Sequence, residues 1–564
     1  MIRLTDIRLP LEHDEAALKA ALLLRLGIAP EELLEFTLFR RAPDARKTSQ
    51  IFFVYSVDVR VRDEAAVLRR CAADARLSPT PDMRYRYPAQ ARADETRRPV
   101  IIGAGPCGLF AGLMLARMGF RPILLERGKI VRERAEDTWG LWRQGKLNPE
   151  SNVQFGEGGA GAFSDGKLSS QTRDPRHLGR KVLEEFVRAG APENILFVSK
   201  PHIGTFRLIK VVENLRAALC ALGAEIRFGC RAEEILIDLD ADGGRQASGV
   251  RLADGSTLRG EHIVLAVGHS ARDTFAMLHE KGVAMESKPF SIGVRIEHPQ
   301  SLIDKARFGR FAGHPLLGAA DYKLVYKAKN GRTAYSFCMC PGGQVVAATS
   351  EPGRVVTNGM IQYSRAERNA NSGMVVDVFP ERDFPTYPHP LSGVEFQRHW
   401  EGRAFEVGGH AYRAPAQLVG DFLAGRPSTR LGTVLPSYQP GIHLTDLALC
   451  LPGFVLETLR EALPVFGRQI RGYDMADALM TGVETRTSSP LRVRRDPKSL
   501  QSENIRGLYP AGEGAGYAGG ILSAAMDGIR AAEALALQMT EDGNGAAEKR
   551  EADEYRPFPE RQAP

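Results

Sequence analysis

Three glycines and a glutamate have the spacing of a loop that binds a dinucleotide. Gly103, Gly105 and Gly108 form a G-x-G-x-x-G pattern between an apolar run and a helical pattern, and Glu126 ends the next apolar run. In such loops the glycines allow a tight turn, a close approach of backbone to a pyrophosphate, and the packing of helix on strand. The acid is placed to accept hydrogen bonds from both hydroxyls of an adenosine ribose, and its charge disfavours a 2′-phosphate.

Two further glycine-rich segments are candidates to lie against the same ligand. The segment 161–168 matches a phosphate-binding P-loop except at its last position, where a leucine replaces the Ser or Thr that ligates Mg²⁺. We therefore interpret 155–161 as a glycine loop that passes the ligand, followed by Lys167 either near the ligand or in a solvated turn. The segment 507–528 predicts a strand, an acidic turn at Glu513, a glycine loop and a helix.

The first 90 residues have a pattern of their own. Strands and helices are predicted in the order βαββαβ, at 2–9, 14–26, 33–41, 50–61, 63–75 and 83–87. This is the order of a ferredoxin-like unit, with Asp14 as a candidate cap of the first helix. RNA-recognition modules share the order, but 51–57 lacks the glycine and the leading cation of their stacking strand. An accessory domain is therefore favoured over RNA binding.

The rest of the chain predicts an α/β fold with an insertion. Apolar runs at 100–102, 123–125, 226–228 and 263–267 predict buried parallel strands. Short strands and turn pairs beyond residue 285 predict a mixed sheet, after which the chain re-enters the α/β unit near Leu508. The predicted division is a ferredoxin-like domain at 1–90, a nucleotide-binding domain at 96–285 and 486–540, a mixed α+β substrate domain at 286–485, and a disordered tail at 541–564.

Composition sets limits on the class of protein. The chain has 564 residues, 43% hydrophobic and 25% charged, which is ordinary for a soluble protein of roughly two to four domains. The net charge of +7 is modest for this length and disfavours a nucleic-acid partner. Seven scattered cysteines do not form a disulfide framework, and neither a signal peptide nor a membrane span is predicted, so we expect a cytoplasmic protein.

Several longer strings resemble one family. They are VIIGAGPCGLFAGL, NVQFGEGGAGAFSDGKL, KPHIGT, LAVGHSARDTF, KPFSIGVRIEHPQ, SFCMCPGG, TGVETRTSSP and LYPAGEGAGYAGGI, spread over nearly the whole chain apart from the tail. The chain resembles bacterial FAD-dependent dehydrogenases or oxidoreductases that have a ferredoxin-like N-terminal domain and no assigned substrate. The resemblance implies FAD as cofactor and a Rossmann fold of the glutathione-reductase type, and it brings no established catalytic residues.

The same resemblance gives roles to the later glycine segments. In glutathione-reductase-type flavoproteins, a segment like 507–528 meets the ribityl chain through its acid, here Glu513, and Gly520 and Ile521 would open the helix beneath the flavin. Gly268 would end a strand that returns to the sheet beside the adenine. The predicted FAD-binding residues are Gly103, Gly105, Pro106, Gly108, Glu126, Arg127, Gly159, Ala160, Gly161, Gly268, Gly512, Glu513, Gly520 and Ile521.

Three side chains are candidates for catalysis. Lys167 is expected near the flavin, and Arg486, followed by three more arginines, would either clamp an anionic substrate or lie in a solvated loop. Cys338 and Cys340 would face the same way on a strand, although an i, i+2 pair lies at the far limit of disulfide geometry. They are therefore either a flavin-linked dithiol or two buried thiols. No metal site is predicted, because the His and Cys spacings match no ligand set.

These features predict an FAD-dependent oxidoreductase of the dehydrogenase type. Hydride would pass between the flavin and an organic small-molecule substrate of unknown identity. Two alternatives stay open, a flavin-dependent RNA-modifying enzyme and a non-catalytic FAD-binding sensor or scaffold. The sequence also leaves open whether the substrate is anionic, whether NADH or NADPH is a transient electron donor, and which oligomer forms.

Overall fold

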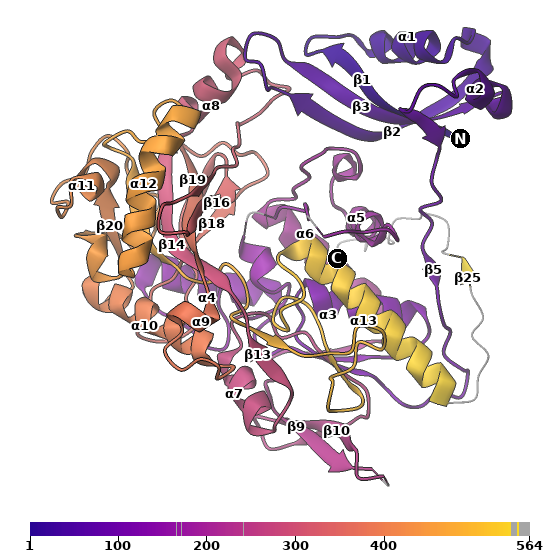
Figure 1. Cartoon of the computed structure of the whole chain (residues 1–564). Coiled ribbons are helices and arrows are strands. Elements are labelled where there is room, and N and C mark those ends of the chain that lie inside the picture. Colours follow the sequence, from indigo (N-terminus) through magenta and orange to yellow (C-terminus); the bar gives the residue numbers. More distant parts are fainter. Residues whose placement is uncertain (165, 171, 241, 543–549, 552–564) are drawn as a thin grey trace, which may run out of the picture.

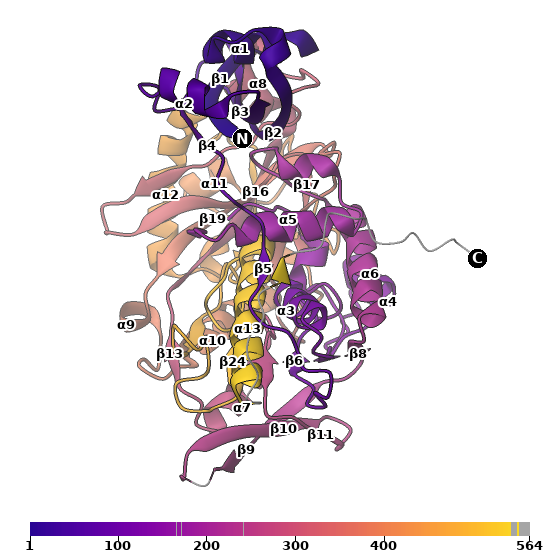
Figure 2. The ribbon, with the colours of Figure 1, turned by 90° about the vertical axis from the view of Figure 1, so that its right-hand side faces the viewer.

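The N-terminal 80 residues form a four-stranded antiparallel sheet with two helices on one face (Figures 1 and 2). A computed structural model of the chain describes residues 1–542 and 550–551, apart from 165, 171 and 241. The elements of this unit are β1 (Ile2–Pro10), α1 (Glu15–Leu26), η1 (Pro30–Glu32), β2 (Leu33–Asp44), β3 (Phe52–Val61), α2 (Glu64–Arg70) and β4 (Leu77–Pro79). The strand order is β2-β3-β1-β4, and Asp14 caps α1 by accepting from the N–H of Ala17.

The end of this unit differs from the prediction. Helix α2 stops at Arg70, and the last strand of the sheet is Leu77–Pro79 in place of the predicted 83–87. Only Arg86–Tyr87 of the predicted strand is extended, as β5, and it pairs with β25 (Arg550–Glu551). The remainder of the predicted tail at 541–564 lies outside the described residues, apart from the end of the last helix.

A five-stranded parallel sheet forms the centre of the α/β region. Its order is β24-β12-β6-β7-β8, from β24 (Leu508–Pro510), β12 (Ile263–Leu265), β6 (Val100–Ile102), β7 (Ile123–Leu125) and β8 (Glu225–Arg227). The helices of this region are α3 (Pro106–Arg117), α4 (Val131–Gln144), α5 (Leu178–Arg188), α6 (Thr205–Ala221), α7 (Arg272–Glu280) and α13 (Ile521–Asp542), with η2 (Ala160–Phe163) and η3 (Glu193–Leu196). The last strand, β24, comes from the far end of the chain, so most of the residues between β12 and β24 lie outside this sheet.

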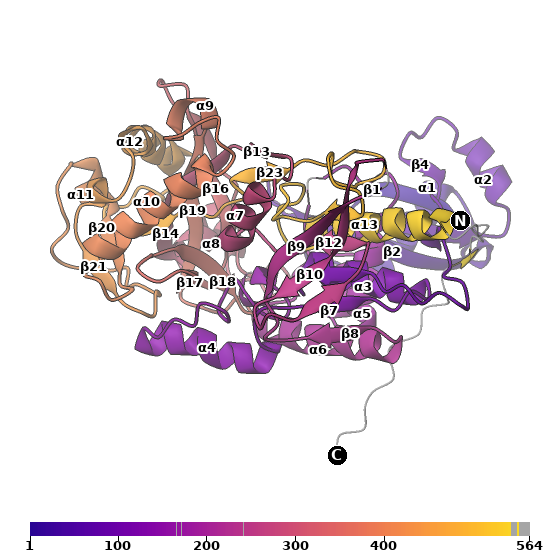
Figure 3. The same ribbon diagram turned by 90° about the horizontal axis from the view of Figure 1, so that it is seen from below.

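Those intervening residues build a second, seven-stranded sheet beside the first region (Figure 3). Its order is β15-β16-β19-β14-β22-β20-β21, from β15 (Val325–Lys327), β16 (Thr333–Cys340), β19 (Asn369–Val378), β14 (Phe290–Pro299), β22 (Leu479–Glu484), β20 (Ala414–Leu418) and β21 (Ile442–Leu444). Its other elements are α8 (Gln300–Phe308), η4 (Gly309–Phe311), β17 (Gly343–Ala347), β18 (Thr357–Ile361), α9 (Pro380–Asp383), α10 (Ser392–Val407), α11 (Val419–Leu423), η5 (Leu447–Leu449) and α12 (Gly453–Gln469).

The chain leaves and re-enters the α/β region through neighbouring strands. The outgoing β13 (Met285–Ser287) pairs antiparallel with the returning β23 (Leu491–Val493). A separate three-stranded sheet, β9 (Ala232–Leu239), β10 (Arg245–Leu252) and β11 (Thr257–Arg259), lies at the lower end of the molecule in Figure 1. Among the described residues, no helix combines the length and apolar character needed to cross a membrane. The strands β13 and β23 lead from the α/β region into the second sheet and back.

Candidate functional site

The predicted glycine loop lies where β6 meets α3. Gly103 has a φ of +103°, and a Cβ there would lie 2.4 Å from the carbonyl oxygen of Ala266. A Cβ on Gly108 would come within 1.8 Å of the carbonyl oxygen of Gly103, so helix and loop can approach this closely only with glycine. Gly105 caps α3 and Pro106 is its first residue, which leaves the helix N-terminus at the end of the sheet.

Glu126 connects three segments of backbone around this loop. Its carboxylate accepts from the N–H groups of Ala104 at 2.8 Å, Gly128 at 2.9 Å and Gly156 at 2.9 Å, and only 5% of the residue is exposed. The structure thus shows a structural role for Glu126 that the sequence did not predict. Glu126 also lines a cavity. Its predicted contact with a ribose stays a prediction.

A second glycine loop and the start of α13 face the first loop. A Cβ on Gly159 would lie 2.9 Å from the Cα of Gly105, so the two glycine loops touch through their backbones. Beyond β24, Asp527 of α13 accepts from the N–H of Gly512 at 2.8 Å and pairs with the buried Arg495 at 2.7 Å. This pair fixes the N-terminal turn of α13 relative to the acidic turn that precedes it.

These segments enclose one side of a cavity of about 1030 Å³. The predicted cofactor residues that line it are Gly103, Gly105, Pro106, Glu126, Arg127, Gly159, Ala160, Gly161, Gly268, Glu513, Gly520 and Ile521. The other two, Gly108 and Gly512, lie behind the wall, where Gly512 packs on Cys107. The predicted residues therefore come from five separate stretches of sequence to one cavity.

The other side of the cavity belongs to the region that contains the second sheet. Residues 335–339 of β16 and Asn358 of β18 line it. The cavity wall also contains cationic side chains, among them Lys167, Lys200, Lys323 and Arg365. Lys167 donates to the carbonyl oxygen of Met339, and Lys200 pairs with Asp321 at 2.5 Å. Lys167 and Cys338, two of the three catalytic candidates, thus lie in the same wall.

The third candidate, Arg486, lies at the edge of the cavity and belongs to a network of buried contacts. It touches the cavity, but its guanidinium is buried and pairs with Glu401 at 3.0 Å. It also donates to the hydroxyls of Ser270 at 3.0 Å and Ser350 at 2.7 Å. These contacts assign Arg486 to a buried network, so it does not lie in a solvated loop, and its contact with an anion in the cavity stays a prediction.

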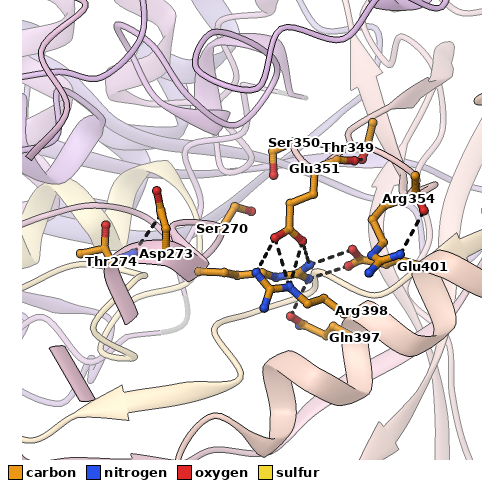
Figure 4. A network of polar contacts seen from close by, with 12 residues as sticks. Ser270, Asp273, Thr274, Thr349, Ser350, Glu351, Arg354, Gln397, Arg398 and Glu401 are labelled. Atoms are coloured by element: carbon orange, nitrogen blue, oxygen red, sulfur yellow. Dashed lines mark hydrogen bonds and ion pairs between the residues drawn. The ribbon is translucent and has the colours of Figure 1, made fainter. Parts of the chain in front are cut away.

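That network connects the α/β region to α10 (Figure 4). Glu401 also pairs with the buried Arg272 at 2.7 Å, and Arg272 and Arg398 share Glu351, each at 2.5 Å. Burial by itself would raise the pKa of Glu401, but the charges of Arg272 and Arg486 outweigh it and hold the pKa well below its usual range. The sequence missed Glu401 and Arg272, because no local motif marks partners that lie far apart in the chain.

His269 is a further cavity residue that the sequence did not single out. It directly follows Gly268, is 9% exposed, and lies in the cavity wall. Burial lowers its pKa, against the opposing charge of Glu513, so the ring is neutral at neutral pH. Its position directly after a predicted cofactor glycine was the signal available in the sequence.

Comparison with known proteins shows which family this architecture represents. Residues 289–487 match the family model described as "FAD-dependent protein, C-terminal domain-like", and residues 1–60 match a domain of unknown function, DUF8436. An uncharacterized protein of Clostridium beijerinckii is 47% identical over 534 residues, covering 94% of this chain and 98% of that protein. The chain belongs to this family of FAD-dependent proteins. FAD is therefore its cofactor.

Solved structures give more distant matches to the chain. The halogenase PltM, solved in complex with phloroglucinol and FAD, is 12% identical with a TM-score of 0.37, covering 80% of this chain and 71% of that one. GidA from Aquifex aeolicus is 12% identical with a TM-score of 0.34, covering 80% of this chain and 65% of that one.

The cavity residues fit FAD. A Cβ on Gly268, Gly519 or Gly520 would have no atom within 4 Å, so these glycines leave open space inside the wall. The N-terminal residues of both α3 and α13 belong to the wall, and helix N-termini favour anionic groups. The structure thus offers backbone surfaces for a pyrophosphate and room for a ring system in the same cavity.

Proposed function

We propose that the protein is an FAD-dependent oxidoreductase that transfers hydride between the flavin and an anionic organic substrate. One observation carries the proposal: a single cavity of about 1030 Å³ joins the glycine-lined FAD side to a second side built by β16 and cationic side chains. Such a volume is at the upper end of ordinary ligand pockets, which hold roughly 300–1,000 Å³. It leaves room for a substrate beside the cofactor.

The α/β residues would hold the cofactor. In this proposal the N–H groups at the start of α3 bind the pyrophosphate, and Glu126 and Arg127 lie on the adenosine side. Glu513 and the first turn of α13 lie on the flavin side. Bound FAD supplies the two-electron chemistry, and the protein supplies orientation and electrostatics.

The cationic wall favours an anionic substrate. Lys323 is exposed within the cavity wall, and Lys167 lies against β16 through the carbonyl of Met339. Positive charges that line a cavity attract and orient anions, while the apolar Phe337 and Met339 would contact the carbon skeleton. The class that fits both features is a small carboxylate or phosphate ester with an oxidisable carbon centre.

The first test is the cofactor and its reduction. Purified protein is expected to carry bound flavin, visible in its absorption spectrum, or to take up added FAD. Anaerobic addition of NADH or NADPH is then expected to bleach the flavin, with either nucleotide acting as a transient electron donor. Protein that neither carries nor takes up FAD contradicts the proposal, and bound flavin that no donor or substrate reduces favours the sensor alternative.

The second test concerns the anion. The flavin spectrum of the holoprotein is titrated with benzoate, succinate and inorganic phosphate. We expect K323Q to raise the Kd of a bound anion about tenfold, which corresponds to about 1.4 kcal/mol. K498Q is the matched control, because Lys498 is an exposed lysine outside the cavity wall. Unchanged affinity of K323Q for all three probes contradicts the anionic subsite.

A further inference from the structure

Strand β16 is irregular where it passes the cavity. Phe337 of β16 pairs with Gly373 of β19, and Cys340 of β16 pairs with Asn371 of β19. Two residues of β16 therefore lie opposite one residue of β19, which is a β-bulge. Cys338 has a φ of +44°, in the left-handed region that residues other than glycine rarely occupy. Strained residues of this kind persist only where the surroundings fix them, and they cluster at functional sites.

Two cysteines lie at the bulge. Cys338 lines the cavity, whereas Cys340 is 0% exposed and lies directly behind it. In a regular strand, Cα atoms two residues apart are about 6.8 Å apart, at the upper limit for a disulfide. Here the Sγ of Cys340 lies 3.3 Å from the carbonyl oxygen of Cys338, so the second thiol is turned back towards the first residue.

A buried arginine lies against both cysteines. Arg295 of β14 is 0% exposed and donates to the carbonyl oxygen of Cys338 at 2.8 Å. A Cβ on Gly359 would lie 2.6 Å from Nη1 of Arg295 and 2.7 Å from Sγ of Cys340, so the guanidinium and this thiol share the space that the glycine leaves. The charge of Arg295 also acts on the side chain of Cys338. The charge therefore lies where it stabilises a thiolate.

The arginine is held in place by its own partners. Glu484 pairs with Arg295 at 2.6 Å, and Asn358 and Asn371 accept from it at 2.9 and 3.2 Å. Burial would lower the pKa of Arg295, but the charges of Glu484 and both cysteines outweigh it and raise that pKa. The guanidinium thus stays charged beside the thiols. Burial raises the pKa of Glu484, and the charge of Arg295 opposes this effect.

We propose that Cys338 and Cys340 are a two-electron dithiol/disulfide couple that exchanges electrons with the FAD bound in the same cavity. Oxidation breaks two S–H bonds and forms one Sγ–Sγ bond. It releases two electrons and two protons, which convert oxidised FAD to its two-electron reduced form. The reverse reaction reduces the disulfide. This inference rests on the flavin of the proposed function and adds a second redox centre, which links the flavin to external thiol or disulfide reagents.

The electron count of the holoprotein tests the couple. The FAD-loaded protein is first oxidised with diamide, freed of reagent, and titrated anaerobically with dithionite. We expect uptake of about four electrons per FAD in the wild type and about two in C338S and in C340S, because each couple holds two electrons. C220S is the matched control, since Cys220 is exposed on α6, away from the cavity, and its count should stay at about four.

Mass spectrometry gives a readout that does not depend on activity. The peptide with both cysteines should lose two hydrogens and escape alkylation after diamide treatment, and regain both thiols on reduction. In the native holoprotein at pH 7, iodoacetamide should alkylate Cys338 faster than the more exposed Cys220, because Arg295 favours its thiolate. A count of about two electrons in wild type, or an intact dithiol peptide after oxidation, overturns the inference. Neither result affects FAD binding or bleaching by NADH, so the proposed function is tested separately.

Discussion

Glycine serves two distinct purposes around the cavity. At Gly108 a side chain would collide with the backbone of Gly103, so glycine there is a requirement of packing. At Gly519 nothing lies within 4 Å of a would-be Cβ, and the residue is an exposed part of the cavity wall. The sequence pattern does not distinguish these cases, because it records only the absence of a side chain. The structure separates glycines that build the loop from glycines that leave room for the ligand.

Gly519 therefore gives a sharp test of where FAD lies. G519A should fold as well as wild type, because the added methyl group meets no protein atom and the position does not have a positive φ. The methyl group would project into the space assigned to the cofactor, so we expect FAD to bind at least about tenfold more weakly, or about 1.4 kcal/mol. The measurement is a titration of the FAD-free protein with FAD, followed by intrinsic fluorescence.

Gly453 supplies the matched control for this variant. It too has nothing within 4 Å of a would-be Cβ, but it begins α12 and does not line the cavity. G453A should bind FAD like wild type. Equal FAD affinity of G519A and G453A would place the cofactor away from the first turn of α13.

At the scale of elements, the sequence predicted those strands whose side chains are buried on both faces. The strands β6, β7 and β12 lie where apolar runs predicted them, because a parallel strand between helices must be apolar throughout. It missed β4, whose residues Leu-Ser-Pro have no strand pattern and are extended only because they pair with Ile2–Leu4 of β1. The local sequence pattern does not show that a segment pairs with a distant strand.

The same reason explains what was missed in the site. Arg486 was singled out because three more arginines follow it, but its partner Glu401 lies on α10 within a helical pattern that gives no sign of function. Two arginines from separate segments converge on this one buried carboxylate. The elements could be predicted singly, whereas the contacts between them required the three-dimensional fold.

The junction of α10 with the α/β region should depend on Glu401. In E401Q the buried Arg272 and Arg486 lose their shared counter-charge, and breaking a buried ion pair from one side typically costs about 3–5 kcal/mol. We expect a loss of stability of this order, measured as the shift of the urea midpoint with FAD present. E406Q is the control on the same helix, because its pair with Arg403 is exposed and should contribute about 1 kcal/mol or less.

The pH dependence of this junction has a definite sign. The pKa of Glu401 is depressed in the folded protein, so the group binds protons more weakly there than in the unfolded chain. Its contribution to stability is present above the unfolded pKa and is lost only as the pH falls through the lower folded value. The difference in stability between wild type and E401Q should therefore persist from pH 7 to pH 5. A difference that disappears over this range would contradict the ionised network.

At the scale of the whole molecule, the N-terminal sheet is attached through few contacts. Arg41 of β2 exchanges backbone hydrogen bonds with Phe197 and Ser199 at 2.6 and 3.0 Å, and no residue of 1–90 lines the cavity. Tyr85, in contrast, contacts the α/β region. It is 7% exposed, and its hydroxyl donates to Glu533 of α13 at 2.9 Å. The packing thus changes near residue 80, ahead of the predicted boundary at 90.

The change in packing near residue 80 predicts how two truncated chains should behave. A chain of residues 81–564 should keep its FAD, because it retains every residue of the cavity wall and both Tyr85 and Tyr87. A chain of residues 91–564 loses these two buried rings, and removing a buried aromatic side chain typically costs about 3–5 kcal/mol. Its thermal midpoint should therefore lie well below that of 81–564, and it should release FAD at a lower temperature.

Loss of FAD from both chains alike would mean that the N-terminal sheet is an integral part of the flavin site. Equal stability of the two would contradict the contribution expected from the contacts of Tyr85 with α13 and of Tyr87 with α3.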